Sequence, residues 1–356
     1  MPATRIRVRT HWFVEPMPIL HPQRRPATTV FSLAVLGLLT FAVTFAVVKA
    51  SHSPIANAPP PESPTVVPIT ASGLSFEAPD DIPAGWTTLR FTNASGMTHF
   101  ALLERLPDGV GVADHQSDVA PLFQKGFEQM AAGQSEAASQ TFAQLPEWFH
   151  DVTFVGGPGL VAPGRTAEAT VRLEPGTYLL ECYAKTNGVF HSYNSLPNAY
   201  GMVREITVTD GEGRRAAAPT PTLELEISKE QGIQRIDDAD LRPGTHTVAV
   251  HFRNQSTYQN FVGHDVHLAR LDSSTSVGTL AAWMDWTQPE GLDTPAPVSF
   301  VGGTNEMAAG ETAYFTVDLA PGRYAWVAEV PQPDEKGMLK PFMVPPGDEI
   351  TSRDGN

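Results

Sequence analysis

The sequence has a single cysteine, few charged residues and none of the common signatures of catalysis. Charged residues make up 18% of the 356 residues. Cys182 has no second cysteine to pair with, so it is a free thiol, an intermolecular link or a metal ligand. No Walker loop, dinucleotide-binding glycine fingerprint, Gly-x-Ser-x-Gly elbow, His-Glu-x-x-His motif or His-x-His pair occurs. We therefore expect that the chain is not an enzyme.

Basic charge is scarce outside the N-terminal region. The chain has 24 Lys and Arg against 39 Asp and Glu, which gives a net charge of -15. Residues 1–49 carry a net charge of +5, so the remainder carries -20. Because an acidic surface repels phosphate groups, we expect no nucleic-acid partner.

One long apolar run is present, at residues 28–48. As a helix it would be about 31 Å long, enough to cross the hydrocarbon core of a membrane. Arginines precede it, which predicts a cytoplasmic basic N-terminus at 1–27 and a periplasmic or extracellular body. The run is longer than a usual signal sequence, which favours an uncleaved transmembrane anchor. Cleavage near Val48–Ala50 and a true start at Met17 stay open.

The segment after the apolar run, residues 49–69, is rich in proline and has no apolar period. Such a stretch is typical of an extended, semi-rigid linker. We expect it to hold the body of the protein off the membrane.

The body of the chain contains an internal repeat. Phe154–Gly157 recurs as Phe300–Gly303, and a Pro-Gly-x-Tyr turn follows in both places. The phenylalanine and the turn tyrosine are 24 positions apart in both halves, at Tyr178 and at Tyr324. Equal spacing of several signals indicates two copies of one structural unit.

The repeat divides the chain into segments with defined bounds. The predicted segments are domain 1 at 70–209, a linker at 210–221, domain 2 at 222–346 and a tail at 347–356.

The hydrophobic pattern of each half is that of β-strands. Apolar and polar residues alternate, as in a strand with one buried face, in four segments: 87–93, 166–173, 246–254 and 312–319. Apolar residues recur at helical spacing around 116–145 and, more briefly, at 280–286. We expect an all-β fold with a short helical insertion in each half, packed against one end of a sandwich.

The first half also has an ordered set of polar and sulfur-containing residues. Asn93 and His99 come first, a Gly-Thr-Tyr turn leads into a strand that ends at Cys182, and His191 and Met202 follow. This order resembles the cupredoxin family, the plastocyanin- and azurin-type β-sandwiches. The resemblance covers residues 70–209 and, more weakly, 222–346, and it implies two tandem Greek-key sandwiches.

The resemblance also implies a copper site made by His99, Cys182, His191 and Met202. Two imidazoles and one thiolate, with a weak axial thioether, are the ligands of electron-transfer copper sites. In the second half, Ala328 stands where Cys182 stands in the first. We therefore expect copper in domain 1 only.

Two functions stay open. In the first, a membrane-tethered extracytoplasmic protein binds one copper ion for electron transfer or copper handling, with a redox or copper-handling protein as its partner. The second follows from the ligand spacing, because eight residues separate Cys182 from His191 and ten separate His191 from Met202, where small blue-copper proteins have a few. This alternative is a metal-free cupredoxin-like module that binds a protein or an envelope component, with the loop at 193–200 as a contact.

Overall fold

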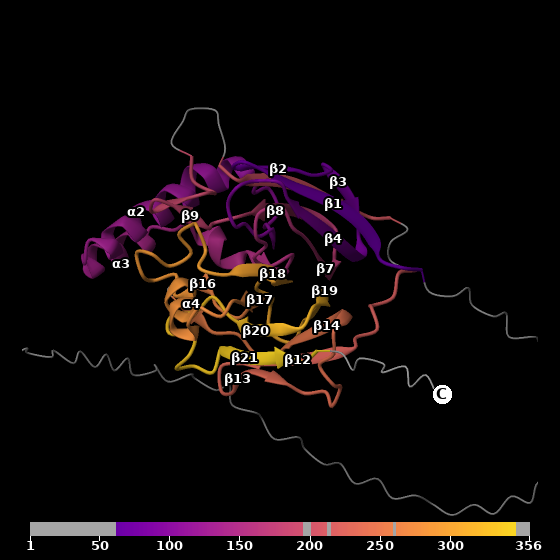
Figure 1. Ribbon diagram of the computed structural model, residues 1–356. Coiled ribbons are helices and arrows are strands. Elements are labelled where there is room, and N and C mark those ends of the chain that lie inside the picture. Colours follow the sequence, from indigo (N-terminus) through magenta and orange to yellow (C-terminus); the bar gives the residue numbers. More distant parts are fainter. Residues whose placement is uncertain (1–61, 195–200, 212–214, 259–260, 347–356) are drawn as a thin grey trace, which may run out of the picture. The chain divides into compact units, whose positions relative to one another are not determined.

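The computed structural model describes residues 62–194, 201–211, 215–258 and 261–346 (Figure 1). The expected transmembrane anchor at 28–48 and the tail at 347–356 lie outside the described residues. Within the described part of the chain, no helix combines the length and the apolar character needed to cross a membrane.

The largest sheet has eight strands, four from each half of the body. Its strands, in order across the sheet, are β13 (Gly232–Arg235), β12 (Leu223–Ser228), β14 (Gly244–Phe252), β19 (Thr312–Leu319), β7 (Thr166–Leu173), β4 (Gly85–Asn93), β1 (Thr65–Ser72) and β2 (Ser75–Glu77). The two halves meet where β19 pairs antiparallel with β7, over three residue pairs from Tyr314–Thr170 to Thr316–Glu168. Figure 1 shows the strands of this sheet following one another from β13 to β2.

Each half has a second sheet of its own. In the first half this sheet is β3 (Asp81–Pro83), β11 (Val203–Thr209), β8 (Gly176–Glu181), β5 (Leu102–Arg105) and β6 (Thr153–Phe154). In the second half it is β18 (Ser299–Thr304), β17 (Val266–Leu271), β20 (Gly322–Val327) and β21 (Leu339–Val344). Two small hairpins complete the strands, β9 (Lys185–Thr186) with β10 (Val189–Phe190) and β15 (Thr257–Tyr258) with β16 (Phe261–Val262).

The four segments of alternating hydrophobicity form β4, β7, β14 and β19, as expected. On β4, for example, Leu89 and Phe91 are fully buried, whereas Arg90 between them is exposed. The same alternation extends the first strand into the stretch expected to be linker. Strand β1 begins at Thr65 because Val67 and Ile69 are buried and its backbone pairs with β4.

One contiguous hydrophobic core runs through both halves. It includes Leu89 and Phe91 of the first half, Phe252 and Phe315 of the second, and Cys182. The described residues, from 62 onward, also belong to a single compact unit. The mostly β architecture is thus present, whereas the division into two tandem domains stays a prediction.

The helices lie largely where helical spacing was expected. The first half has α1 (Val112–Asp114), a π-helical turn η1 (His115–Val119), α2 (Ala120–Ala131), α3 (Ser135–Phe142) and a 3-10 turn η2 (Glu147–Asp151), and the second half has α4 (Val277–Met284). The break between α2 and α3 contains Gly133, whose φ of 71° a residue with a side chain rarely adopts. Gln124 of α2 bonds the backbone of Gly188 and Phe190, so this helix holds the β9–β10 hairpin in place.

Candidate metal centre

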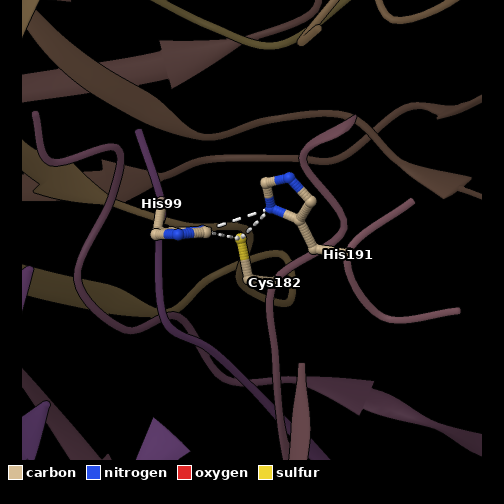
Figure 2. A group of neighbouring side chains, drawn as sticks. All are labelled: His99, Cys182 and His191. Carbon is tan, nitrogen blue, oxygen red and sulfur yellow. Dashed lines mark hydrogen bonds between the residues drawn. The ribbon is translucent and has the colours of Figure 1, made fainter. Parts of the chain in front are cut away.

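Three of the four predicted ligands converge in the core of the first half. The Nδ1 atoms of His99 and His191 are 3.2 Å apart, and the Cys182 Sγ lies 3.5 Å from the first and 3.9 Å from the second. Figure 2 shows the three side chains pointing toward one another. All three are at most 2% exposed, so the cluster is closed to bulk water.

His99 is positioned by the turn that precedes it. The buried Asn93 ends β4, and its side-chain amide donates to the carbonyls of Met97 (2.7 Å) and Val161 (2.8 Å). The backbone of His99 in turn exchanges two hydrogen bonds with Val161, at 3.2 and 2.7 Å. An asparagine that satisfies both the turn and the neighbouring strand therefore fixes where the His99 ring enters the core.

Cys182 and Met202 come together through the backbone. Cys182 follows the last residue of β8, and its N–H donates to the Met202 carbonyl at 3.1 Å. The Met202 N–H donates to the His191 carbonyl at 2.6 Å, and the Met202 side chain is fully buried. A Cβ at Gly201 would lie 2.2 Å from the Ser192 carbonyl oxygen, so only glycine allows this close approach. The backbone thus places Met202 beside both Cys182 and His191.

The eight residues between Cys182 and His191 form a β-hairpin. Strands β9 and β10 pair antiparallel, and the two residues between them are Asn187 and Gly188, with φ of 53° and 75°. Asn-Gly with positive φ at both positions is the preferred two-residue hairpin turn. The hairpin returns the chain toward its start, so the His191 N–H reaches the Ala184 carbonyl at 2.8 Å.

Two threonine hydroxyl groups hold the outer nitrogen of His191 in place. The Thr294 hydroxyl donates to the Lys185 carbonyl at 3.0 Å, and the Thr186 and Thr294 hydroxyl oxygens are 2.7 Å apart. The Thr186 hydroxyl oxygen lies 2.8 Å from the His191 Nε2 and 3.3 Å from the Met97 sulfur. Thr186 can therefore accept the Nε2 proton of His191 when Nδ1 presents its lone pair to a metal.

Burial keeps the three groups neutral in the metal-free protein. It lowers the pKa of His99 to about 4, and burial together with the charge of His99 lowers the pKa of His191 to about 3. Burial also raises the pKa of the Cys182 thiol to about 12. Both imidazoles can thus donate a lone pair at neutral pH, and metal binding would release the thiol proton.

The spacing of the three atoms fits a metal ion. With about 2.0 Å to nitrogen and about 2.3 Å to thiolate sulfur, ligands at tetrahedral to trigonal angles lie about 3.3–3.5 Å (N to N) and about 3.5–3.7 Å (N to S) apart. The observed distances of 3.2, 3.5 and 3.9 Å are close to these values. Two imidazoles and one thiolate are the donor set that suits copper.

The second half of the chain covers this cluster. Besides Thr294, its Asp293 carboxylate accepts from the N–H groups of Asn187 and Gly188 at 2.9 and 3.1 Å. Thr186 and Thr294 were not predicted from the sequence, since no local pattern links residues 108 positions apart. The Asn187-Gly188 pair is a sequence signal for a tight hairpin turn. Such a turn indicates that the chain between Cys182 and His191 folds back, which brings these two residues together despite their separation.

The corresponding place in the second half lacks a thiol. His264 is fully buried like His99, but its Nδ1 bonds the Asn254 carbonyl at 2.8 Å. Ala328 occupies the place of Cys182, and its N–H bonds the Met338 carbonyl at 2.9 Å, as Cys182 does with Met202. The backbone arrangement is therefore kept while the thiolate donor is missing.

Comparison with known proteins gives distant structural likenesses. No family model and no curated protein matches the sequence. Auracyanin A, a "blue" copper protein from Chloroflexus aurantiacus, is 21% identical, covers 41% of this chain and 100% of its own, and has a TM-score of 0.24. Auracyanin from Roseiflexus castenholzii is 19% identical, covers 42% of this chain and 99% of its own, and has a TM-score of 0.23. The blue copper oxidase from Nitrosomonas europaea is 11% identical, covers 80% of this chain and 86% of its own, and has a TM-score of 0.21. None of these scores assigns the chain to a family.

Proposed function

We propose that the chain binds one copper ion through His99, Cys182 and His191, with Met202 as the axial ligand, and carries electrons outside the cytoplasm. The observation that carries this proposal is the convergence of two imidazole Nδ1 atoms and one thiol sulfur within 3.9 Å. When bound, copper would supply a one-electron redox couple. Domain 1 would be the electron carrier of two tandem cupredoxin-like domains, held at the membrane by residues 28–48.

The enclosure of the site favours electron transfer over copper delivery. His99, Cys182 and His191 are at most 2% exposed, and Thr294 of the second half hydrogen-bonds the threonine that holds His191. A metal that leaves must therefore displace side chains that cover the site, whereas an electron needs no such opening. The second half would then act as a scaffold that keeps water out of the centre. The expectation that the chain is not an enzyme, and its redox partner, stay predictions.

Copper reconstitution tests the proposal directly. The purified chain is loaded with Cu²⁺, desalted, and measured for retained copper and for visible absorption. We expect one copper per chain and an intense thiolate-to-copper charge-transfer band, both lost in Cys182→Ala. His264→Gln is the matched control, because it alters the equivalent histidine of the half without a thiol, and it should keep the band.

A colourless wild-type protein that loses its copper on desalting would leave the metal-free module as the better account. The search would then move to protein or envelope partners of the second candidate function, in which the 193–200 loop is the contact.

A further inference from the structure

The helical insertion of the first half covers a cavity on the outer face of a sheet. Glu104 of β5 is paired with Leu179 of β8, and Leu179 packs with Val112 of α1 in a small cluster separate from the main core. Glu181 lies two residues further along β8, so its side chain is on the same face as Leu179. The cavity between this face and the helices has a volume of about 50 Å³, and both glutamate side chains line it.

The two carboxyl groups are the acidic part of this cavity. Glu104 is 3% exposed and Glu181 is 6% exposed. Within the described part of the chain, no N–H group and no alcohol or phenol O–H group donates to the Glu104 carboxyl group. Burial, together with the charge of Glu181, raises the pKa of Glu104 well above its usual range. The pair therefore holds a proton between its members unless another cation neutralises it.

His115, on the π-helical turn η1, faces Glu181 across the cavity. Its Nδ1 accepts from the Gln116 side-chain amide at 3.3 Å, and the same amide nitrogen donates to the Ser192 carbonyl at 2.8 Å. Burial lowers the pKa of His115, so the imidazole is neutral and its proton is on Nε2, 3.6 Å from Glu181 Oε2. Glu181 thus has a donor on one side, whereas Glu104 has none besides its partner carboxyl group.

The remaining walls of the cavity favour an organic cation over a metal ion. Glu104, His115 and Glu181 do not converge to the metal-ligand spacing that the copper ligands show. Aromatic rings attract cations through their faces, and carboxylates accept N–H groups. A volume of about 50 Å³ has room for about three or four water-sized groups, which fits an ammonium head with one or two carbons. The aromatic residues of the lining are Phe123, Phe149, Phe154, Tyr183 and Phe190.

We propose that Glu104 and Glu181 bind the head group of a small primary ammonium compound inside this cavity. The N–H groups of the ligand donate to the two carboxylates, and its positive charge replaces the proton that the pair otherwise holds. The aromatic rings surround the carbon atoms of the ligand. This site lies on the opposite face of β8 from Cys182, which belongs to the hydrophobic core, so it is separate from the proposed copper centre.

The test titrates methylammonium into the full, copper-free chain by isothermal titration calorimetry. A chelator is present, because an amine would otherwise bind to copper. We expect one methylammonium per chain, and no binding of sodium at equal ionic strength or of tetramethylammonium, which has no N–H group. Glu104→Gln keeps the shape of the side chain but removes its charge, so it should weaken methylammonium binding at least about tenfold. The matched control is Glu168→Gln, which removes a carboxylate from a surface ion pair with Arg90 and should leave binding unchanged.

A second variant tests the cavity itself. Ala120 lines it and is 4% exposed, so Ala120→Leu should fill the space and abolish methylammonium binding while both carboxyl groups remain. Near-ultraviolet circular dichroism shows whether each variant is folded, and Ala120→Leu replaces Glu104→Gln if the latter is not. Wild-type protein that binds no methylammonium would overturn the inference, because the shared proton would then be the only cation of the pair. Binding that survives both substitutions would overturn it as well, since the ligand would then lie elsewhere on the acidic surface.

Discussion

The neutral, buried state of His191 makes a quantitative prediction about acid sensitivity. In the unfolded chain this imidazole takes up a proton below about pH 6.5, whereas in the folded, metal-free protein its pKa is about 3. A base with a depressed folded pKa contributes stability that is complete above pH 6.5 and is lost as the pH falls toward 3. At pH 5 the difference in proton uptake amounts to about 2 kcal/mol.

The assay compares copper-free wild type with His191→Gln, in chelator, by urea unfolding between pH 7.5 and pH 5. We expect the free energy of unfolding of wild type, relative to the variant, to fall by about 2 kcal/mol over this range. Buried carboxyl groups such as Glu104 and Glu329, whose pKa values burial raises, change stability in the opposite direction. They are present in both proteins, so the difference between the two curves cancels their effect.

A constant difference in the free energy of unfolding between wild type and His191→Gln does not bear on the prediction, because loss of the imidazole ring also changes packing. Only the change of this difference with pH is tested. Parallel curves would refute the reasoning, since they would mean that His191 takes up a proton as readily in the folded as in the unfolded protein. A steeper fall in the variant would contradict it as well.

Three further substitutions separate the roles of the centre. Cys182→Ala should remove the copper band yet lower the free energy of unfolding by less than about 2 kcal/mol, because the second half has an alanine, Ala328, at the position that corresponds to Cys182. A larger loss of stability in urea titrations would show that the thiol is mainly structural. Thr186→Val removes the hydroxyl group that hydrogen-bonds the His191 Nε2. With copper on Nδ1, that nitrogen carries the ring proton, so without its acceptor the imidazole donates less charge and the copper reduction potential should rise. An unchanged potential in a redox titration would speak against this hydrogen bond as a tuning element. Met202→Leu should keep copper bound and raise the potential if its thioether is an axial ligand, whereas an unaltered potential would leave Met202 with packing alone.

The strands could be predicted from the sequence because a strand with one buried face alternates apolar and polar residues. Leu89 and Phe91 are buried and Arg90 is exposed, and this period of two is visible without any tertiary information. Strand β1, which begins at Thr65, was not predicted, because the prolines around Val67 favoured a linker up to residue 69.

The candidate site could be predicted in part. The order of His99, Cys182 and His191 pointed to a metal centre, and the structure brings their donor atoms together. The length of the loop between Cys182 and His191 was an argument against a metal centre. The Asn187-Gly188 turn resolves this, because a tight hairpin uses up residues without moving its ends apart.

The sequence by itself determined the strands, the repeated turns and the identity of the donor atoms, since periodicity and residue type are local properties. Only the tertiary structure decided that β7 and β19 join the halves into one sheet, that Thr294 hydrogen-bonds the threonine beside His191, and that the Tyr183 hydroxyl donates to the buried Glu306. Those contacts join residues about a hundred or more positions apart, and their proximity is set by sheet pairing and core packing, which no local pattern records.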